Sequence, residues 1–144
     1  MNDVKSDHQE KRELMARALA ARANSYCPYS GYSVGAALLT AAGHIYCGCN
    51  IENAGYSPTL CAERAAMAQA VSAGERQFVM LAVAGGPAGK APETCFWPCG
   101  VCRQWLAEFC GPDFPVLCGV SESDFREVAL SDLLPYAFSP ATLT

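Results

Sequence analysis

The chain has 144 residues, of which 51% are hydrophobic and 17% are charged, and its net charge is −4 with a pI near 5.1. This length suits one domain with its own hydrophobic core, so we expect a single domain over residues 1–144. The acidic balance argues against a nucleic-acid surface, and no apolar run is long enough to cross a membrane. The polar start of the chain argues against a signal peptide and predicts a cytoplasmic protein.

The chain contains nine cysteines, which is a high and odd number. In a cytoplasmic protein of this size, metal binding or catalysis explains cysteines better than a disulfide framework does. Three of them lie in the motifs described below. The other six are expected to be small buried hydrophobic residues, with Cys95 the most open to another role because it lies in a loop near a motif. These six are Cys27, Cys47, Cys49, Cys95, Cys110 and Cys118.

Apolar periodicity and turn residues predict an alternation of helices and strands. Helices are expected over about residues 7–24, 60–73, 98–110 and 132–134. Strands are expected over 32–40, 45–50, 78–84, 115–120 and 125–129. Strands that alternate with helices indicate a three-layer α/β domain built around one sheet.

Several local signals refine this outline. Ser6, Thr59 and Ser131 are expected to cap the first, second and last of these helices. The small residues from Gly35 to Ala37 predict that a helix packs closely on the first strand.

Three cysteines have the spacing of a metal site. Cys99 and Cys102 form a Cys-x-x-Cys pair, and Cys61 is a plausible third ligand. A structural zinc site uses four protein ligands, whereas a catalytic site uses three and leaves one position for water. His8 and His44 lie in a polar arm and a hairpin turn, so we expect them to be surface histidines rather than a fourth ligand. The pattern therefore favours a catalytic zinc.

The predicted helix starts strengthen this interpretation. Cys61 and the Cys99/Cys102 pair lie near helix N-termini, where free N–H groups and the helix dipole favour thiolates. Arg64 or Arg103 could donate hydrogen bonds to the ligand sulfurs, although either could also be a solvated helix arginine.

Glu63 follows Cys61 by two residues and can reach water at the metal without being a ligand. It could take a proton from that water and pass it to a leaving group. Alone, Glu63 would more often be a surface acid near a helix start, which the dipole favours. Next to Cys61 we interpret it as the catalytic acid–base residue.

Five motifs in order resemble the small, homotetrameric, zinc-dependent cytidine deaminases. The motifs lie at residues 29–38, 48–54, 61–64, 98–104 and 133–138, and the resemblance runs from about Cys27 to Phe138. It implies an α/β/α fold with a mixed five-stranded sheet, a homotetramer, and deamination of cytidine and 2′-deoxycytidine in pyrimidine salvage.

The resemblance also implies the chemistry of the site. Cys61, Cys99 and Cys102 would bind one zinc ion per subunit, and zinc-bound hydroxide would attack C4 of the pyrimidine. Glu63 would carry protons to N3 and to the departing amine, releasing ammonia. Arg64 would donate hydrogen bonds to ligand sulfurs.

Further residues of these motifs would bind the nucleoside. Asn50 and Glu52 would hydrogen-bond the ribose hydroxyls, although from the residues alone they could merely order their loop. The Ala62 backbone would hold the base edge, Tyr32 would stack on the base, and Phe138 would reach the site of a neighbouring subunit.

The sequence departs from the family pattern at three of these positions. Tyr32 stands where the family usually has phenylalanine, Ser33 replaces a common proline, and Trp97 stands where serine often precedes Pro-Cys-Gly. These departures bear on substrate range, and Trp97 is expected to narrow the pocket.

Two other functions remain open at this point. The related blasticidin S deaminases share both zinc motifs, and a structural zinc module would need a fourth protein ligand. The Asn-Ile-Glu-Asn segment at residues 50–53 favours an ordinary nucleoside. Nucleic-acid deaminases usually carry histidine in place of Cys61 and more positive charge, so this class fits the sequence poorly.

Overall fold

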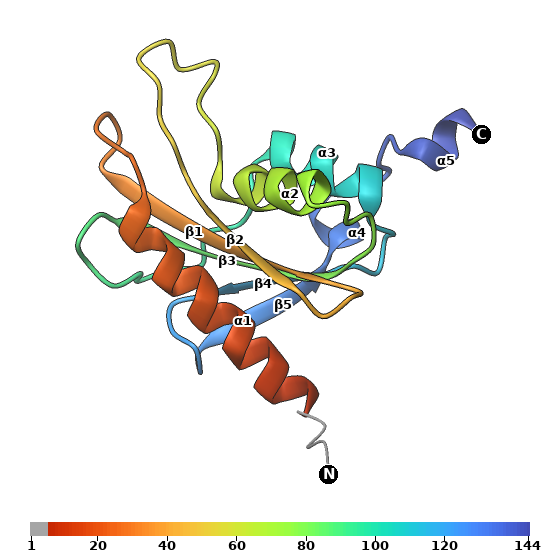
Figure 1. Ribbon diagram of the computed structural model, residues 1–144, viewed down its shortest axis with the longest axis horizontal. Helices are drawn as coiled ribbons and strands as arrows, with labels where there is room; N and C mark the ends of the chain where they lie inside the picture. The colour runs from red at the N-terminus through yellow and green to blue at the C-terminus, as the bar shows by residue number, and fades with distance from the viewer. Residues whose placement is uncertain (1–5) are drawn as a thin grey trace.

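A computed structural model describes residues 6–144 and contains one mixed sheet of five strands in the order β2-β1-β3-β4-β5 (Figure 1). The strands are β1 (Tyr32–Thr40), β2 (Ile45–Cys49), β3 (Phe78–Pro87), β4 (Pro115–Gly119) and β5 (Phe125–Ala129). β3 and β4 pair in parallel, and the other neighbours pair antiparallel. The predicted three-layer α/β/α fold with a mixed five-stranded sheet is confirmed.

Helices cover both faces of this sheet. They are α1 (Asp7–Ala21), the 3-10 turn η1 (Arg22–Asn24), α2 (Ala62–Ser72), α3 (Gly100–Phe109), α4 (Leu130–Leu133) and α5 (Pro140–Leu143). α1 packs on one face, where Leu14 and Met80 belong to one hydrophobic core. α2 and α3 pack on the other face, where Met67 and Leu106 are buried (Figure 1). None of the helices in residues 6–144 has the length and apolar character needed to span a membrane.

Two glycines set how closely the helices approach the sheet. A Cβ atom at Gly35 would lie 2.0 Å from the carbonyl oxygen of Ala18 in α1, and one at Gly48 would lie 2.5 Å from that of Ala62 in α2. The close packing predicted from the small residues of β1 is therefore confirmed. Because Ala62 follows Cys61 directly, the contact at Gly48 also fixes the height of the start of α2 above the sheet.

The start of α2 differs from the prediction. The helix begins at Ala62 with Cys61 as its N-cap, so the predicted cap at Thr59 and start at Leu60 are wrong. Leu60 instead forms an isolated bridge with Ile51, which keeps the backbone extended up to Cys61. The Thr59 hydroxyl accepts the N–H of Asn53 at 3.1 Å. Cys61 therefore lies at the helix boundary and not inside the first turn.

Other boundaries also differ. β3 continues to Pro87 rather than ending at Ala84, because its last residues still pair with β1 as far as Tyr32. The predicted cap at Ser131 is wrong, since α4 begins two residues earlier than predicted, at Leu130, with Ala129 as its N-cap. The first helix ends as a 3-10 turn, and α5 had no sequence prediction.

Candidate active site

Two helix N-termini bring three cysteine thiols together. Cys61 is the N-cap of α2, Cys99 is the N-cap of α3, and Cys102 lies in the first turn of α3. The Sγ atoms of Cys61 and Cys99 lie 3.8 Å apart, those of Cys99 and Cys102 lie 3.6 Å apart, and all three fall within 4.8 Å of one another. Four-coordinate zinc with Zn–S bonds of about 2.3 Å holds its sulfurs at similar separations. The predicted three-thiol cluster is confirmed.

The histidines lie elsewhere. The ring of His8 stacks on Phe125, and His44 pairs with Glu75, so neither joins the cluster. Within residues 6–144 the group that can hold a metal consists of the three cysteines alone. Such a donor set suits zinc and leaves a coordination position for water, as in catalytic sites.

The surroundings of Cys61 favour the negatively charged thiolate, which can bind a cation. The Cys102 thiol donates to the sulfur of Cys61 and, with the guanidinium of Arg64, lowers the pKa of Cys61 to about 5. The same shared proton, together with burial, raises the pKa of Cys102. At neutral pH, Cys61 is therefore a thiolate, which is the form that binds a metal.

Only one of the two candidate arginines contacts a ligand sulfur. Nη2 of Arg64 lies 3.3 Å from Sγ of Cys61. Arg103 instead donates to the carbonyl oxygens of Pro98 at 2.6 Å and Leu133 at 2.7 Å, so it supports the α3 start and the C-terminal segment. The alternative role of Arg103 at the sulfurs is wrong.

Glu63 lies in the first turn of α2 and is only 3% exposed. Burial raises the pKa of its carboxyl group, while a hydrogen bond with Cys102 opposes that shift. An acid whose pKa moves towards neutrality can both accept and donate a proton under working conditions. The structure thus places a buried carboxyl group with a raised pKa next to the thiols.

A cavity of about 520 Å³ opens beside this cluster. Its lining residues are Ser30, Tyr32, Val34, Asn50, Glu52, Thr59, Leu60, Cys61, Ala62, Glu63, Phe96, Trp97 and Cys99. The size is that of pockets that hold small-molecule ligands. Phe138 does not line the cavity: it is 58% exposed, and its carbonyl oxygen accepts a hydrogen bond from Gln104 at 2.8 Å.

Asn50 already uses its side chain within the protein. Its Oδ1 accepts the N–H of Val34 at 2.9 Å and the hydroxyl of Ser25, and its Nδ2 donates to the carbonyl oxygen of Tyr32 at 2.8 Å. This amide therefore orders the beginning of β1. A single Nδ2 hydrogen remains for a ligand.

Glu52 is held as an acceptor at the edge of the cavity. Its carboxylate accepts the N–H groups of Tyr29 and Ser30 at 2.9 and 3.1 Å, and the hydroxyl of Ser30. The bonds from Ser30 and then Tyr29 lower the pKa of Glu52, so it stays ionised at neutral pH. An ionised carboxylate is a strong acceptor for ligand hydroxyl groups.

Phe96 is a wall residue that the sequence did not reveal. Its ring lies 6.2 Å from that of Tyr32 between centroids, and a Cβ atom at Gly85 would come within 2.9 Å of its Cγ. Gly85 pairs with Val34, another residue of the wall. The signal that could have found this contact is the glycine pair at the end of an apolar strand, which marks close approach of another group.

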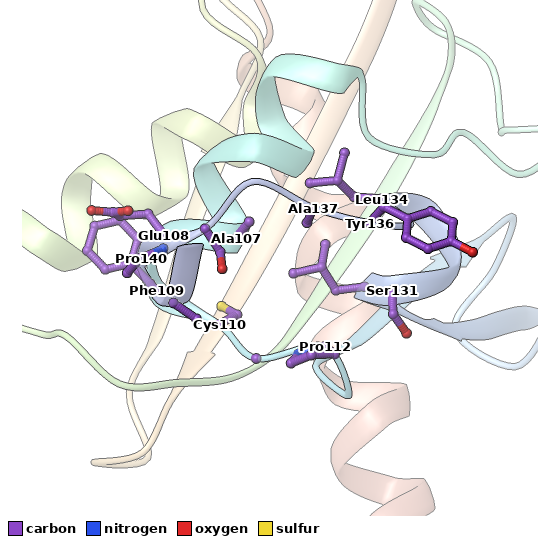
Figure 2. Close-up of a pocket in the computed structure, with 14 residues that line it drawn as sticks. Ala107, Glu108, Phe109, Cys110, Pro112, Ser131, Leu134, Tyr136, Ala137 and Pro140 are labelled. Carbon is purple, nitrogen blue, oxygen red and sulfur yellow. The ribbon is translucent and has the colours of Figure 1, made fainter. Parts of the chain in front are cut away.

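A second cavity, of about 560 Å³, lies at the C-terminal end of α3 (Figure 2). Residues of α3, α4 and the C-terminal segment surround it, among them Cys110, Leu134 and Tyr136. None of the sequence-predicted site residues lines this cavity. The smaller cavity beside the thiols is therefore the candidate site.

Comparison with known proteins agrees with this site. The sequence model of the cytidine and deoxycytidylate deaminase zinc-binding region matches residues 8–118. A cytidine deaminase of Sporosarcina psychrophila is 47% identical over 92% of this chain and 93% of that protein. One from Halalkalibacterium halodurans is 43% identical over 90% of this chain and 95% of that protein.

Solved structures show the same fold. The crystal structure of cytidine deaminase from Burkholderia pseudomallei superposes with a TM-score of 0.78 at 42% identity, over 88% of this chain and 97% of that chain. The one from Mycobacterium tuberculosis has a TM-score of 0.75 at 40% identity, over 88% and 94%. Fold and cluster together define a zinc-dependent hydrolytic deaminase. Within that class the chain belongs to the cytidine deaminase family.

Proposed function

We propose that the protein hydrolyses cytidine and 2′-deoxycytidine to uridine and 2′-deoxyuridine and releases ammonia. The observation that carries this proposal is the buried carboxylate of Glu63 in the same cavity as Cys61 and Cys99. A purely structural zinc site needs neither a cavity nor a buried acid. Two relatives at 47% and 43% identity are named cytidine deaminase, which supports a cytosine nucleoside as the substrate.

Cys61, Cys99 and Cys102 are the proposed ligands of one zinc ion per subunit. Their sulfurs have suitable separations, and Cys61 is already a thiolate at neutral pH. When bound, zinc supplies Lewis-acid activation of water. Arg64 offsets part of the negative charge of the thiolates through its contact with Cys61.

Glu63 is the proposed proton carrier. It takes a proton from the water that attacks C4 and delivers that proton to N3 of the base. It then takes the second proton of that water from the new hydroxyl at C4 and delivers it to the amine that leaves. The C4–N bond breaks, the electron pair departs with nitrogen as ammonia, and a carbonyl forms at C4. Burial raises the pKa of this carboxyl group, which suits a group that must both accept and donate.

The rest of the cavity is proposed to bind the nucleoside. Glu52 accepts hydrogen bonds from the ribose hydroxyls, and Asn50 donates its remaining Nδ2 hydrogen to the ribose. Tyr32 stacks on the base, and the backbone of Ala62 holds the base edge. A cavity with apolar walls and a few placed polar groups is typical of small-ligand sites.

Assembly and cellular role are proposed from the family resemblance. The exposed Phe138 would reach the site of a neighbouring subunit in a homotetramer. We further propose that the chain acts as one domain, in the cytoplasm, in pyrimidine salvage. Both hydrophobic cores share the same sheet, which supports the single domain.

The test is turnover and zinc content measured on the same samples. Cytidine, 2′-deoxycytidine and blasticidin S are the substrates, and ammonia release is the readout. Glu63→Gln should keep its zinc and lose about 10²- to 10⁴-fold in kcat, as expected for an acid–base group. Glu108→Gln, an exposed change on α3 outside the cavity, is the control. Full activity of Glu63→Gln would contradict the mechanism, and turnover of blasticidin S alone would contradict the substrate.

A further inference from the structure

The loop between β3 and α3 is tied to one rung of the sheet by three consecutive residues. The rung is the pair formed by Cys118 in β4 and Arg126 in β5. The Cys95 thiol donates to the Cys118 carbonyl oxygen at 3.5 Å, and the Phe96 N–H donates to the Cys118 sulfur. The guanidinium carbon of Arg126 lies 5.7 Å from the ring centroid of Trp97.

These contacts fix the Trp97 ring at the wall of the cavity. One side of the half-buried ring meets Arg126, and the ring also packs against the core that contains Leu106 and Cys118. Because a cation over an indole ring and a packed core both hold it, the ring has little freedom to swing out. Trp97 is thus a rigid boundary of the cavity and lies two residues before the ligand Cys99.

The orientation of the base decides which edge meets this boundary, and this step rests on the proposed function. C4 must lie at the thiol cluster, and N3 must face Glu63 on α2. In a pyrimidine ring, N3 and C5 flank C4 on opposite sides. The C5 edge therefore points away from α2 and towards the loop that carries Trp97 next to Cys99.

We propose that Trp97 is a specificity-determining residue that excludes substituents on C5 of the cytosine ring. This part of the cavity wall is an aromatic ring that Arg126 and the hydrophobic core hold in place. The ring therefore cannot move aside for an added methyl group as a flexible side chain would. One methyl group typically changes the specificity of an apolar pocket by about 10- to 200-fold. The wild-type enzyme is therefore expected to process 5-methylcytidine at least about tenfold less efficiently than cytidine.

The test measures kcat/KM for cytidine and 5-methylcytidine in the wild type and three variants. The ratio of the two values, compared between proteins, cancels the intrinsic reactivity of each nucleoside. Trp97→Ala should raise the ratio of 5-methylcytidine to cytidine about tenfold or more. Trp105→Ala is the matched control, because this second tryptophan is 40% exposed on α3 and does not line the cavity. Its ratio should equal that of the wild type.

Arg126→Gln provides an independent variant that keeps Trp97. Arg126 is exposed on β5 and lies outside the cavity, so its replacement should leave folding intact and loosen only the ring. The ratio should then rise by a smaller factor than in Trp97→Ala. This readout separates a role in specificity from a general loss of packing, which would lower both efficiencies together.

Each outcome decides the inference. An unchanged ratio in Trp97→Ala overturns it, as does a wild type that accepts both nucleosides equally. Should Trp97→Ala fail to fold, an unchanged ratio in Arg126→Gln overturns it and a raised one supports it. A zinc-loaded wild type that turns over neither nucleoside refutes the proposed function instead, so the two failures are distinguishable.

Discussion

Nη2 of Arg64 lies 3.3 Å from the sulfur of Cys61, and both residues belong to the start of α2. Glu63 lies between them in sequence and is buried in the same turn. One helix start therefore carries the proposed metal ligand Cys61, the proposed proton carrier Glu63 and the arginine that contacts the ligand sulfur. Because a helix turn is rigid, a shift of α2 relative to the sheet would displace all three groups together.

Removal of the Arg64 charge should weaken zinc binding. Arg64→Gln is expected to lower the zinc affinity about 10- to 100-fold, because the donor that stabilises the Cys61 thiolate is lost. Arg76→Gln is the control, since Arg76 donates to the carbonyl oxygens of Val71, in the last turn of α2, and of Glu75, far from the helix start. Competition with a zinc chelator measures both affinities, and equal values for the two variants would rule out this role.

Glu63 should reduce the stability of the metal-free protein. Its pKa is raised in the folded state by burial, so the unfolded chain loses the proton first as pH rises. The unfolded state is then favoured progressively above the unfolded-state pKa of about 4.5, and the loss stops growing above the folded pKa. Metal-free Glu63→Gln should therefore melt at a higher temperature than the wild type at pH 7.

The size of this difference should depend on pH. At pH 4 the Glu63 carboxyl group is largely protonated in both the folded and the unfolded state, so the melting temperatures of wild type and Glu63→Gln should converge. Thermal melts of chelator-treated protein at pH 4 and pH 7 give the comparison. A gap that is equal at the two pH values would show that the carboxylate is not the cause.

Gly35→Ala should destabilise the protein by about 1 to 3 kcal/mol or more, as overpacking typically does. The added Cβ would lie 2.0 Å from the carbonyl oxygen of Ala18, which is backbone and cannot rotate away. Gly111→Ala is the matched control, because a Cβ atom there meets nothing within 4 Å. Urea unfolding of both variants measures their free energies of unfolding. Equal values would show that α1 can move away from the added Cβ atom at little cost.

The thiol cluster was largely predictable from the sequence because its members stand in short local motifs. The Cys-x-x-Cys pair and the neighbours Cys61 and Glu63 come together through short helix starts. The helix boundary at Cys61 was not predictable, since the bridge between Ile51 and Leu60 depends on tertiary pairing. Sequence spacing alone also could not decide between Arg64 and Arg103.

The walls of the cavity were less predictable. Phe96 reaches the cavity only because Gly85, in another element, leaves room for its ring. Asn50 reads as a ligand-binding residue in the sequence, yet three hydrogen bonds to Ser25, Val34 and Tyr32 occupy its amide. Such contacts join segments far apart in the chain, and the periodicity of hydrophobic residues does not predict them. The role of Asn50 at the ribose remains a prediction.

Glu52→Gln should weaken nucleoside binding and leave the chemical step largely intact. The carboxylate lies at the cavity, outside the thiol cluster, and hydrogen bonds from Ser30 and Tyr29 keep its pKa low. Loss of a hydrogen bond to a charged group typically costs about 1.5 to 3 kcal/mol, so kcat/KM for cytidine should fall about 10- to 150-fold, mainly through KM. Glu93→Gln is the control, because Glu93 is exposed in the β3–α3 loop and does not line the cavity. A fall in kcat with an unchanged KM would contradict a role in ribose binding.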